Sequence, residues 1–258
     1  MTAADVLLAV PNISEGRRPD LVHQIAGDDA TLLDVHIDPD HNRTVLTLGG
    51  EPPAVIASSK AIFDRAVHLL DLSDHDGAHP RFGVVDVFPF VPYGAAEADA
   101  SRAADELAAH AVALSVPAYY YDAKLLLPDL RRRLRERRYR GHPSAGVMCV
   151  GVRAPLIAFN VTIHATLAQA RRVAADVRRL PHVRALAFDL PSRGLVQVSM
   201  NLVEPQTTGP RVVFDRIEAQ AEVQDAEVVG LVPASIDLGG LPLRGTLRTI
   251  EGALDRPE

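Results

Sequence analysis

Histidine is the residue type in this sequence that most clearly suggests chemistry, because its side chain gains or loses a proton near neutral pH. The chain has ten histidines. Five of them gather between positions 36 and 79, namely His36, His41, His68, His75 and His79. His79 stands apart because Pro80 and Arg81 follow it just before an apolar run, where a proline-stiffened backbone can hold an imidazole in place. We therefore rank His79 first among the candidates for acid–base chemistry.

Two short segments combine histidines with aspartates and offer nitrogen and oxygen ligands that Zn²⁺ or Mn²⁺ could use. The first group is His36, Asp38, Asp40 and His41, and the second is Asp74, His75, Asp76, His79 and Asp86. Neither group has the spacing of a specific metal signature such as H-E-x-x-H. We therefore expect no catalytic metal.

A basic run extends from Arg131 to Arg140 in a chain whose formal net charge is −6. Guanidinium groups pair with two oxygen atoms of a carboxylate or phosphate at once, so the run is a candidate docking surface for such anions. The alternative is a solvated face, because Lys60 and Lys124 are the only lysines among the 27 basic residues and arginine is common throughout. Both interpretations stay open at the level of sequence.

The elements that must position these residues follow one order twice, β-α-β-β-α-β. The first set is a strand over 5–10, a helix over 19–26, strands over 31–37 and 43–48, a helix over 52–70 and a strand over 84–91. The second set is a strand over 156–163, a helix over 167–178, strands over 183–189 and 195–203, a helix over 211–221 and a strand over 227–232. A helix over 95–113, a strand over 118–122 and the arginine-rich stretch 129–140 lie between the two sets. The sequence thus predicts an α+β fold of two ferredoxin-like subdomains, 1–153 and 154–258, with a ligand cleft between them.

Composition limits the classes of protein to consider. With 258 residues, 47% hydrophobic and 23% charged, the chain is an ordinary folded protein of one large or two small domains. The negative net charge argues against a protein that coats nucleic acid or an anionic membrane, and favours small-molecule partners. Cys149 is the only cysteine, so no internal disulfide forms and we expect a cytoplasmic protein. The first ten residues lack the features of a secretory signal.

The longest apolar run covers residues 145–163. It contains Arg153, Pro155 and Asn160, which a membrane-spanning helix tolerates poorly. We interpret the run as a glycine-rich loop followed by one buried strand.

Six motifs together resemble the formiminotransferase family. In chain order they are V-P-N-I-S-E-G (10–16), N-R-T-V (42–45), D-H-D-G-A-H-P-R-F-G-V-V-D-V-F-P-F-V-P (74–92), L-I-A-F-N (156–160), Q-V-S-M-N-L (197–202) and V-G-L-V-P (229–233). They stand in the order typical of the family and span nearly the whole chain. The combination is far more specific than any single motif.

The resemblance implies a reaction. Family members move a formimino group from N-formimino-glutamate to N5 of tetrahydrofolate, which acts as co-substrate, and the catalytic histidine of the H-P-R motif corresponds to His79. An imidazole can take the proton of the attacking folate amine and return it to the departing glutamate nitrogen. No metal is needed, the partners are small molecules, and we expect a homodimer.

The resemblance also suggests binding residues. Asn12, Arg43 and Arg81 adjoin the matched motifs and are candidates to orient the polar ends of the substrate, the alternative being hydrogen bonds within turns. His36 stands where the family usually has an aspartate, and Asp38 could supply the missing carboxylate. The folate site of the family uses a longer loop with a D-F-G-P motif, whereas this chain has a shorter segment there. Its candidate folate-binding residues are Gly141, His142, Pro143, Ser144 and Gly146.

These two departures from the family pattern keep other functions open. One is a related folate one-carbon enzyme with a different acceptor, or with 5-formyltetrahydrofolate as substrate. Another is a ligand-binding homologue without catalysis. We also expect no helical cyclodeaminase domain, which some members of the family carry, because the sequence continues for only about 25 residues after the last matched motif.

Overall fold

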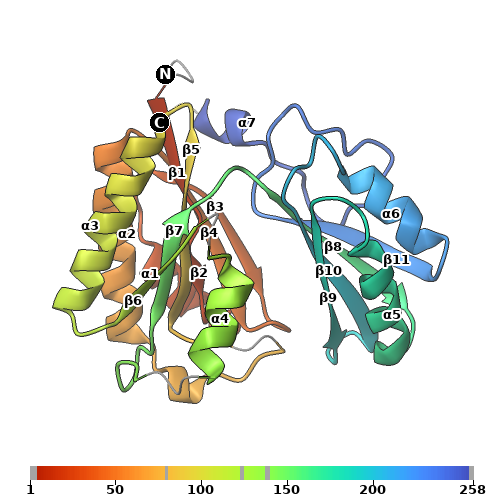
Figure 1. Cartoon of the computed structure of the whole chain (residues 1–258), viewed down its shortest axis with the longest axis horizontal. Helices are drawn as coiled ribbons and strands as arrows, with labels where there is room; N and C mark the ends of the chain where they lie inside the picture. Colours follow the sequence, from red (N-terminus) through yellow and green to blue (C-terminus); the bar gives the residue numbers. More distant parts are fainter. Residues whose placement is uncertain (1–4, 79–80, 123–124, 137–139, 256–258) are drawn as a thin grey trace. The chain divides into compact units, whose positions relative to one another are not determined.

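The computed structural model describes residues 5–78, 81–122, 125–136 and 140–255. It divides into two compact units, one up to Ala154 and the other from Pro155 onward. Unit 1 and unit 2 each have their own sheet (Figure 1). Each also has its own hydrophobic core. Each unit is described by itself below.

Unit 1 contains a seven-stranded sheet. Its strands are β1 (Val6–Ala9), β2 (Asn12–Ile13), β3 (Leu32–Asp38), β4 (Arg43–Gly50), β5 (Val85–Tyr93), β6 (Ala118–Tyr121) and β7 (Met148–Val152). Both β1 and β2 pair antiparallel with β4 on one side and with β5 on the other, so they act as one strand interrupted at Pro11. With β3 outside β4, this arrangement is the split β-α-β order that the sequence predicts.

Helices cover both faces of this sheet (Figure 1). They are α1 (Pro19–Ala26), α2 (Pro52–Leu69), α3 (Glu97–Ala113) and α4 (Leu127–Glu136), with a short 3-10 turn, η2 (Leu72–Asp74). Both α1 and α2 begin at a proline, whose missing N–H costs nothing in a first helical turn. The helices α1, α2 and α3 pack on one core, whereas α4 places Leu130 and Leu134 on a separate cluster that includes Cys149.

The strand β7 corrects the expectation of a loop at the start of the 145–163 run. It pairs parallel with β5 and β6 and extends the sheet beyond the ferredoxin-like order. Gly151 made this segment resemble a loop, because glycine in a strand interior is unfavourable. A Cβ atom at Gly151 would lie 2.2 Å from the carbonyl oxygen of Tyr121, so glycine is what lets the neighbouring backbone approach.

Unit 2 repeats the same strand order without the extension. Its strands are β8 (Ile157–His164), β9 (Val183–Leu190), β10 (Leu195–Leu202) and β11 (Glu222–Val229), and its helices are α5 (Leu167–Val177), α6 (Pro210–Glu218) and α7 (Ile250–Leu254). The order across the antiparallel sheet is β11-β8-β10-β9. Two ferredoxin-like units were predicted, and the repeated order confirms the prediction.

The last helix and strand of this repeat differ from the prediction in their bounds. The helix α6 ends three residues before the expected Ala221, and β11 starts at Glu222 rather than Glu227. The first half of β11 is largely exposed and contains a bulge between Val223 and Asp225. Its charged residues and irregular spacing therefore hide the alternation by which a strand is recognised.

Candidate functional site

The predicted catalytic residue, His79, lies outside the described residues, as does Pro80. The described chain ends at Ala78 on one side and resumes at Arg81 on the other. Separate polar networks hold these two flanking segments, both within unit 1. The candidate site is built from these networks.

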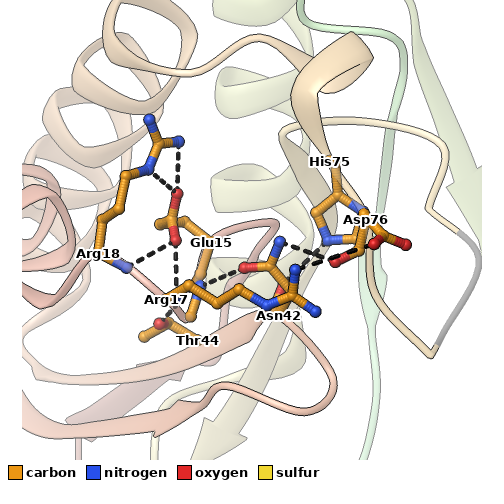
Figure 2. A network of polar contacts seen from close by, with 8 residues as sticks. Glu15, Arg17, Arg18, Asn42, Thr44, His75 and Asp76 are labelled. Carbon is orange, nitrogen blue, oxygen red and sulfur yellow. Dashed lines mark hydrogen bonds and ion pairs between the residues drawn. The ribbon is translucent and has the colours of Figure 1, made fainter.

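Asn42 holds the segment that precedes the H-P-R motif (Figure 2). Its side-chain oxygen accepts a hydrogen bond from the amide of Gly16 at 2.9 Å, and its Nδ2 donates to the carbonyl of Asp76 at 3.1 Å. The Nε2 atom of His75 donates to the carbonyl of Asn42 at 2.9 Å. Asn42 has a φ of 45°, a left-handed conformation in which asparagine is enriched. One residue therefore joins three chain segments that are distant in sequence.

Two glycines allow these segments to touch through their backbones. A Cβ atom at Gly77 would lie 2.5 Å from the carbonyl oxygen of His41, and one at Gly16 would lie 2.3 Å from that of Asp38. Cβ atoms do not approach carbonyl oxygens so closely in real structures. Beside Gly77, the amide of Ala78 points at the carbonyl of Asp40 at 3.5 Å. A larger residue at Gly77 would push the 75–78 segment away from the 40–42 turn, and one at Gly16 would push the 15–18 segment away from β3 and β4.

Glu15 is a buried carboxylate that holds residues 15–18, the segment that leads into α1 (Figure 2). Its Oε1 accepts from the amides of Arg17 and Arg18 at 2.7 and 2.9 Å, and its Oε2 accepts from Nε of Arg18 at 2.6 Å. Burial by itself raises the pKa of Glu15, but these hydrogen bonds outweigh it and hold the pKa below its usual value. The carbonyl of Glu15 accepts from the hydroxyl of Thr44 at 2.6 Å. The carboxylate thus fixes the entry to α1, and the backbone carbonyl of the same residue joins this entry to β4.

Asp86 holds the segment that follows the H-P-R motif. Its side chain is fully buried on β5 and accepts from the amide of Phe82 at 2.9 Å and from Nη1 of Arg81 at 3.2 Å. Nη2 of Arg131, on α4, contacts the same carboxylate oxygen as Arg81. Burial lowers the pKa of Arg81 to about 10; the charge of Asp86 opposes this shift, whereas those of Arg43 and Arg131 reinforce it. Positive charge is therefore concentrated around one carboxylate.

The other predicted binding residues of β3 and β4 lie beside these networks. Asp38 ends β3 opposite Arg43 of β4, and its Oδ1 accepts from the amide of His41 at 2.9 Å. His36 lies two residues earlier, so His36 and Asp38 face the same side of the strand. Asn12 is on β2, where its Nδ2 donates to the carbonyl of Val10 at 3.2 Å, a bond within the interrupted strand. The charge of Arg43 acts on the pKa of Arg81, so these two predicted binding residues lie near each other.

The 141–146 segment, where folate-binding residues are predicted, is a compact turn. His142 and Gly146 exchange two backbone hydrogen bonds at 2.8 and 2.9 Å. Nδ1 of His142 accepts from the amide of Ala145 at 3.1 Å, and the carbonyl of Ser144 accepts from the amide of Leu72 at 2.7 Å. A Cβ atom at Gly146 would lie 2.2 Å from the carbonyl oxygen of Phe82. The turn therefore packs directly on the residue that follows Arg81, and its role in folate binding stays a prediction.

Unit 2 contributes a buried polar surface to which the sequence analysis assigned no role. Asn160 and Thr162 on β8 and Gln197 on β10 are at most 2% exposed, and they alternate with apolar residues of the core. They therefore occupy the sheet face opposite the core. Nδ2 of Asn160 lies 3.4 Å from Oε2 of Glu227, whose other oxygen pairs with Arg244 at 2.6 Å. Polar residues at alternate positions of apolar strands were the signal that could have found this surface.

Three further observations concern the described residues. Among residues 5–78, 81–122, 125–136 and 140–255, no group of three or more histidine, cysteine, aspartate or glutamate side chains is arranged to hold a metal ion. Burial raises the pKa of the Cys149 thiol to about 12, so this thiol is protonated at neutral pH and is a poor nucleophile. In the same described ranges, the helices are all too short or too polar to cross a membrane.

Comparison with known proteins matches both units to one family. The model of the formiminotransferase domain, N-terminal subdomain, matches residues 6–142, and the model of the formiminotransferase domain matches residues 158–240. The chain belongs to the formiminotransferase family. The resemblance in the six motifs is thereby confirmed.

Named members of the formiminotransferase family align along most of the chain. A glutamate formimidoyltransferase from Thermoplasma acidophilum is 31% identical, and the alignment covers 87% of each chain. A glutamate formimidoyltransferase from Streptococcus pyogenes is 28% identical over 90% of each chain. A formimidoyltransferase-cyclodeaminase from Sus scrofa is 33% identical over 87% of this chain but only 49% of its own length. The chain therefore spans about half the length of the bifunctional relatives and most of the length of the others.

Proposed function

We propose that this chain transfers a formimino group from N-formimino-glutamate to tetrahydrofolate. The observation that carries the proposal is the match over both units to relatives of similar length named glutamate formimidoyltransferase. The family models support it independently, because each unit matches its own subdomain model. Transfer between two small molecules is also consistent with the composition of the chain.

His79 acts in this proposal as the general acid and base. N5 of tetrahydrofolate attacks the amidine carbon of N-formimino-glutamate, forming a new C–N bond and a tetrahedral species. The imidazole accepts the proton that the folate nitrogen loses. It then returns that proton to the glutamate nitrogen as the old C–N bond breaks, so that free glutamate leaves. An imidazole suits both steps because its pKa lies near neutral pH.

The described networks support the proposal by holding Ala78 and Arg81, the described residues on either side of positions 79 and 80. Ala78 lies beside the 40–42 turn, and Arg81 is anchored to Asp86 on β5. Anchors of this kind reduce the conformational freedom of a catalytic group before substrate binds, which contributes to rate. Asp38, next to His36, is the carboxylate that we propose to pair with the cationic amidine.

A single substitution tests the assignment of His79. His79→Asn should lower kcat by about 10²–10⁴-fold, the usual effect of losing a proton-transfer group. The assay mixes the purified chain with N-formimino-glutamate and tetrahydrofolate and measures glutamate and formimino-folate by chromatography. His68→Asn is the matched control, because His68 is exposed on α2 in the same unit.

The outcomes separate the three functions considered from the sequence. Loss of transfer in His79→Asn with full activity in His68→Asn supports the proposal. Turnover of 5-formyltetrahydrofolate in place of N-formimino-glutamate would indicate the related folate enzyme. Folate binding without turnover of either compound by the wild type would indicate a ligand-binding homologue.

A further inference from the structure

Two arginines from distant parts of unit 1 converge on one buried carboxylate. Arg81 follows the H-P-R histidine and Arg131 lies 50 positions later on α4, and both bind the same oxygen of Asp86. The exposed fractions of the three side chains are 3% for Arg81, 15% for Arg131 and 0% for Asp86. Two guanidinium charges therefore share one carboxylate charge in a place with little water.

Several donors of this cluster have no acceptor among the described residues. Nε and Nη2 of Arg81 and Nε of Arg131 are buried and make no hydrogen bond in the described part of the chain. Asp86 has limited capacity left, because one of its oxygens already accepts from the amide of Phe82 and the other from both arginines. Buried N–H groups without acceptors are rare in folded proteins, and each is costly. The cluster thus has both an excess of positive charge and donors that need an acceptor.

Two other charged groups of the same unit, one buried and one exposed, have partners within the protein. Glu15 uses both of its oxygens, receiving two backbone amides and the guanidinium of Arg18. The neighbour of Arg131 on α4, Arg132, pairs with Asp129 at 3.0 Å on the exposed side of the helix. The cluster of Arg81 and Arg131 is different because it contains two arginines and one carboxylate. A second carboxylate, brought by a ligand, would balance the charge and accept the remaining hydrogen bonds.

We propose that Arg81 and Arg131 form a subsite for a carboxylate of a glutamyl group. The identity of the ligand rests on the proposed function, since both N-formimino-glutamate and the tail of tetrahydrofolate carry glutamyl carboxylates. Arg131 is the more exposed of the two arginines and supplies the approach from solvent. In the described part of the arginine-rich run, Arg131 is turned toward Asp86, whereas its neighbour Arg132 is exposed.

Binding measured without turnover tests the subsite directly. Isothermal titration calorimetry of the wild-type chain compares glutarate, a dicarboxylate, with glutaramide, which has the same length and no charge. Glutarate should bind at least tenfold more tightly. Arg131→Gln should weaken glutarate binding by roughly ten- to a hundredfold, the value of a charge-assisted hydrogen-bonded pair. Arg102→Gln is the control, because Arg102 is exposed on α3 and pairs with Asp99 three residues away.

A second variant guards against a folding defect. Arg131→Lys keeps the charge but loses the planar fork, so glutarate affinity should fall between those of the wild type and Arg131→Gln. Circular dichroism confirms that each variant is folded. The comparison of glutarate with glutaramide needs no variant at all. Equal binding of the two compounds, no binding of glutarate, or equal weakening in Arg131→Gln and Arg102→Gln would overturn the subsite.

Steady-state kinetics then identify which glutamyl group binds. If the KM for N-formimino-glutamate rises in Arg131→Gln while the KM for tetrahydrofolate is unchanged, the subsite takes the donor. The opposite pattern assigns it to the folate tail. A fall in kcat with both KM values unchanged would overturn it. A wild type that binds glutarate selectively but transfers no formimino group would refute the proposed function and leave the subsite standing.

Discussion

Unit 1 and unit 2 have the same strand order but differ in where their charged groups lie. In unit 1, Arg81 and Asp86 form an ion pair whose side chains are 3% and 0% exposed. In unit 2, Arg193 and Asp225 are 23% and 15% exposed, and Arg244 is about half exposed. Both units therefore share the same sheet as a scaffold. The ion pair of Arg81 and Asp86, the most deeply buried of those compared, lies in unit 1, which also contains the H-P-R motif.

The difference follows from what each unit adds to its four common strands. Unit 1 adds α3, β6, α4 and β7, and Leu130 and Leu134 of α4 pack beside Phe82 and Cys149. This packing closes water out from Asp86. In unit 2, β11 is followed by a long segment without helices up to Ile250, and Arg244 in that segment stays partly solvated. Burial of charge depends on the added elements more than on the shared sheet.

The largest effect on stability is expected at Asp86. Asp86→Asn removes the carboxylate between two arginines and should destabilise unit 1 by roughly 3–5 kcal/mol, as is typical when one partner of a buried ion pair is lost. Asp225→Asn in unit 2 should cost only about 1–2 kcal/mol, because its partner is partly solvated. Hydrogen exchange followed by mass spectrometry measures each unit separately. Equal losses in the two variants would contradict the contrast in burial.

The next largest expected effect is on kcat, and it comes from comparing alanine substitutions at two glycines, one in each unit. Gly77→Ala places a Cβ atom against the carbonyl of His41 and should displace the 75–78 segment, lowering kcat by about 10²-fold. Gly194 of unit 2 has a φ of 63° but no heavy atom near its Cβ position. Gly194→Ala should therefore leave kcat unchanged and reduce stability by about 1 kcal/mol. Kinetic assays with thermal melts of both variants check this, and an unchanged kcat in Gly77→Ala would show that the close contact is irrelevant to catalysis.

The smallest expected effect is a change with pH in the stability that Glu15 gives to α1. Since the pKa of Glu15 is lowered on folding, its contribution is fully present above the usual value of 4.5 and is lost as the pH falls through the folded-state pKa. Glu15→Gln should weaken the protection of α1 amides by about 2 kcal/mol at pH 7, with the difference from wild type shrinking below pH 4.5. The control in unit 2 is Asp176→Asn, because Asp176 forms a surface ion pair with Arg216 that water screens. Hydrogen exchange across this pH range should show a larger change for Glu15→Gln, and a pH-independent difference would refute the role of the ionised carboxylate.

Local patterns in the sequence were sufficient for most of the secondary structure. The helix α1 has the predicted bounds, and α2 starts at the predicted proline and ends one residue early. The order of strands and helices in both units also follows from alternation and from turn residues. These features depend on residues close together in the chain, so one sequence is enough to recognise them. The formiminotransferase motifs are likewise visible as short segments.

The partners of the buried polar groups were decided by the tertiary structure. Nothing in the arginine-rich run distinguishes Arg131 from Arg132, yet one reaches Asp86, 45 positions away, and the other stays at the surface. Only the tertiary structure shows that Gly151 lies in a strand, against the backbone of Tyr121. It also supplies the hydrogen-bond partner of Asn160, which is Glu227 on β11. The sequence determines which segments become strands and helices, because that choice depends on nearby residues. Which charges meet, and which donors remain without acceptors, is decided only when distant segments pack together and exclude water.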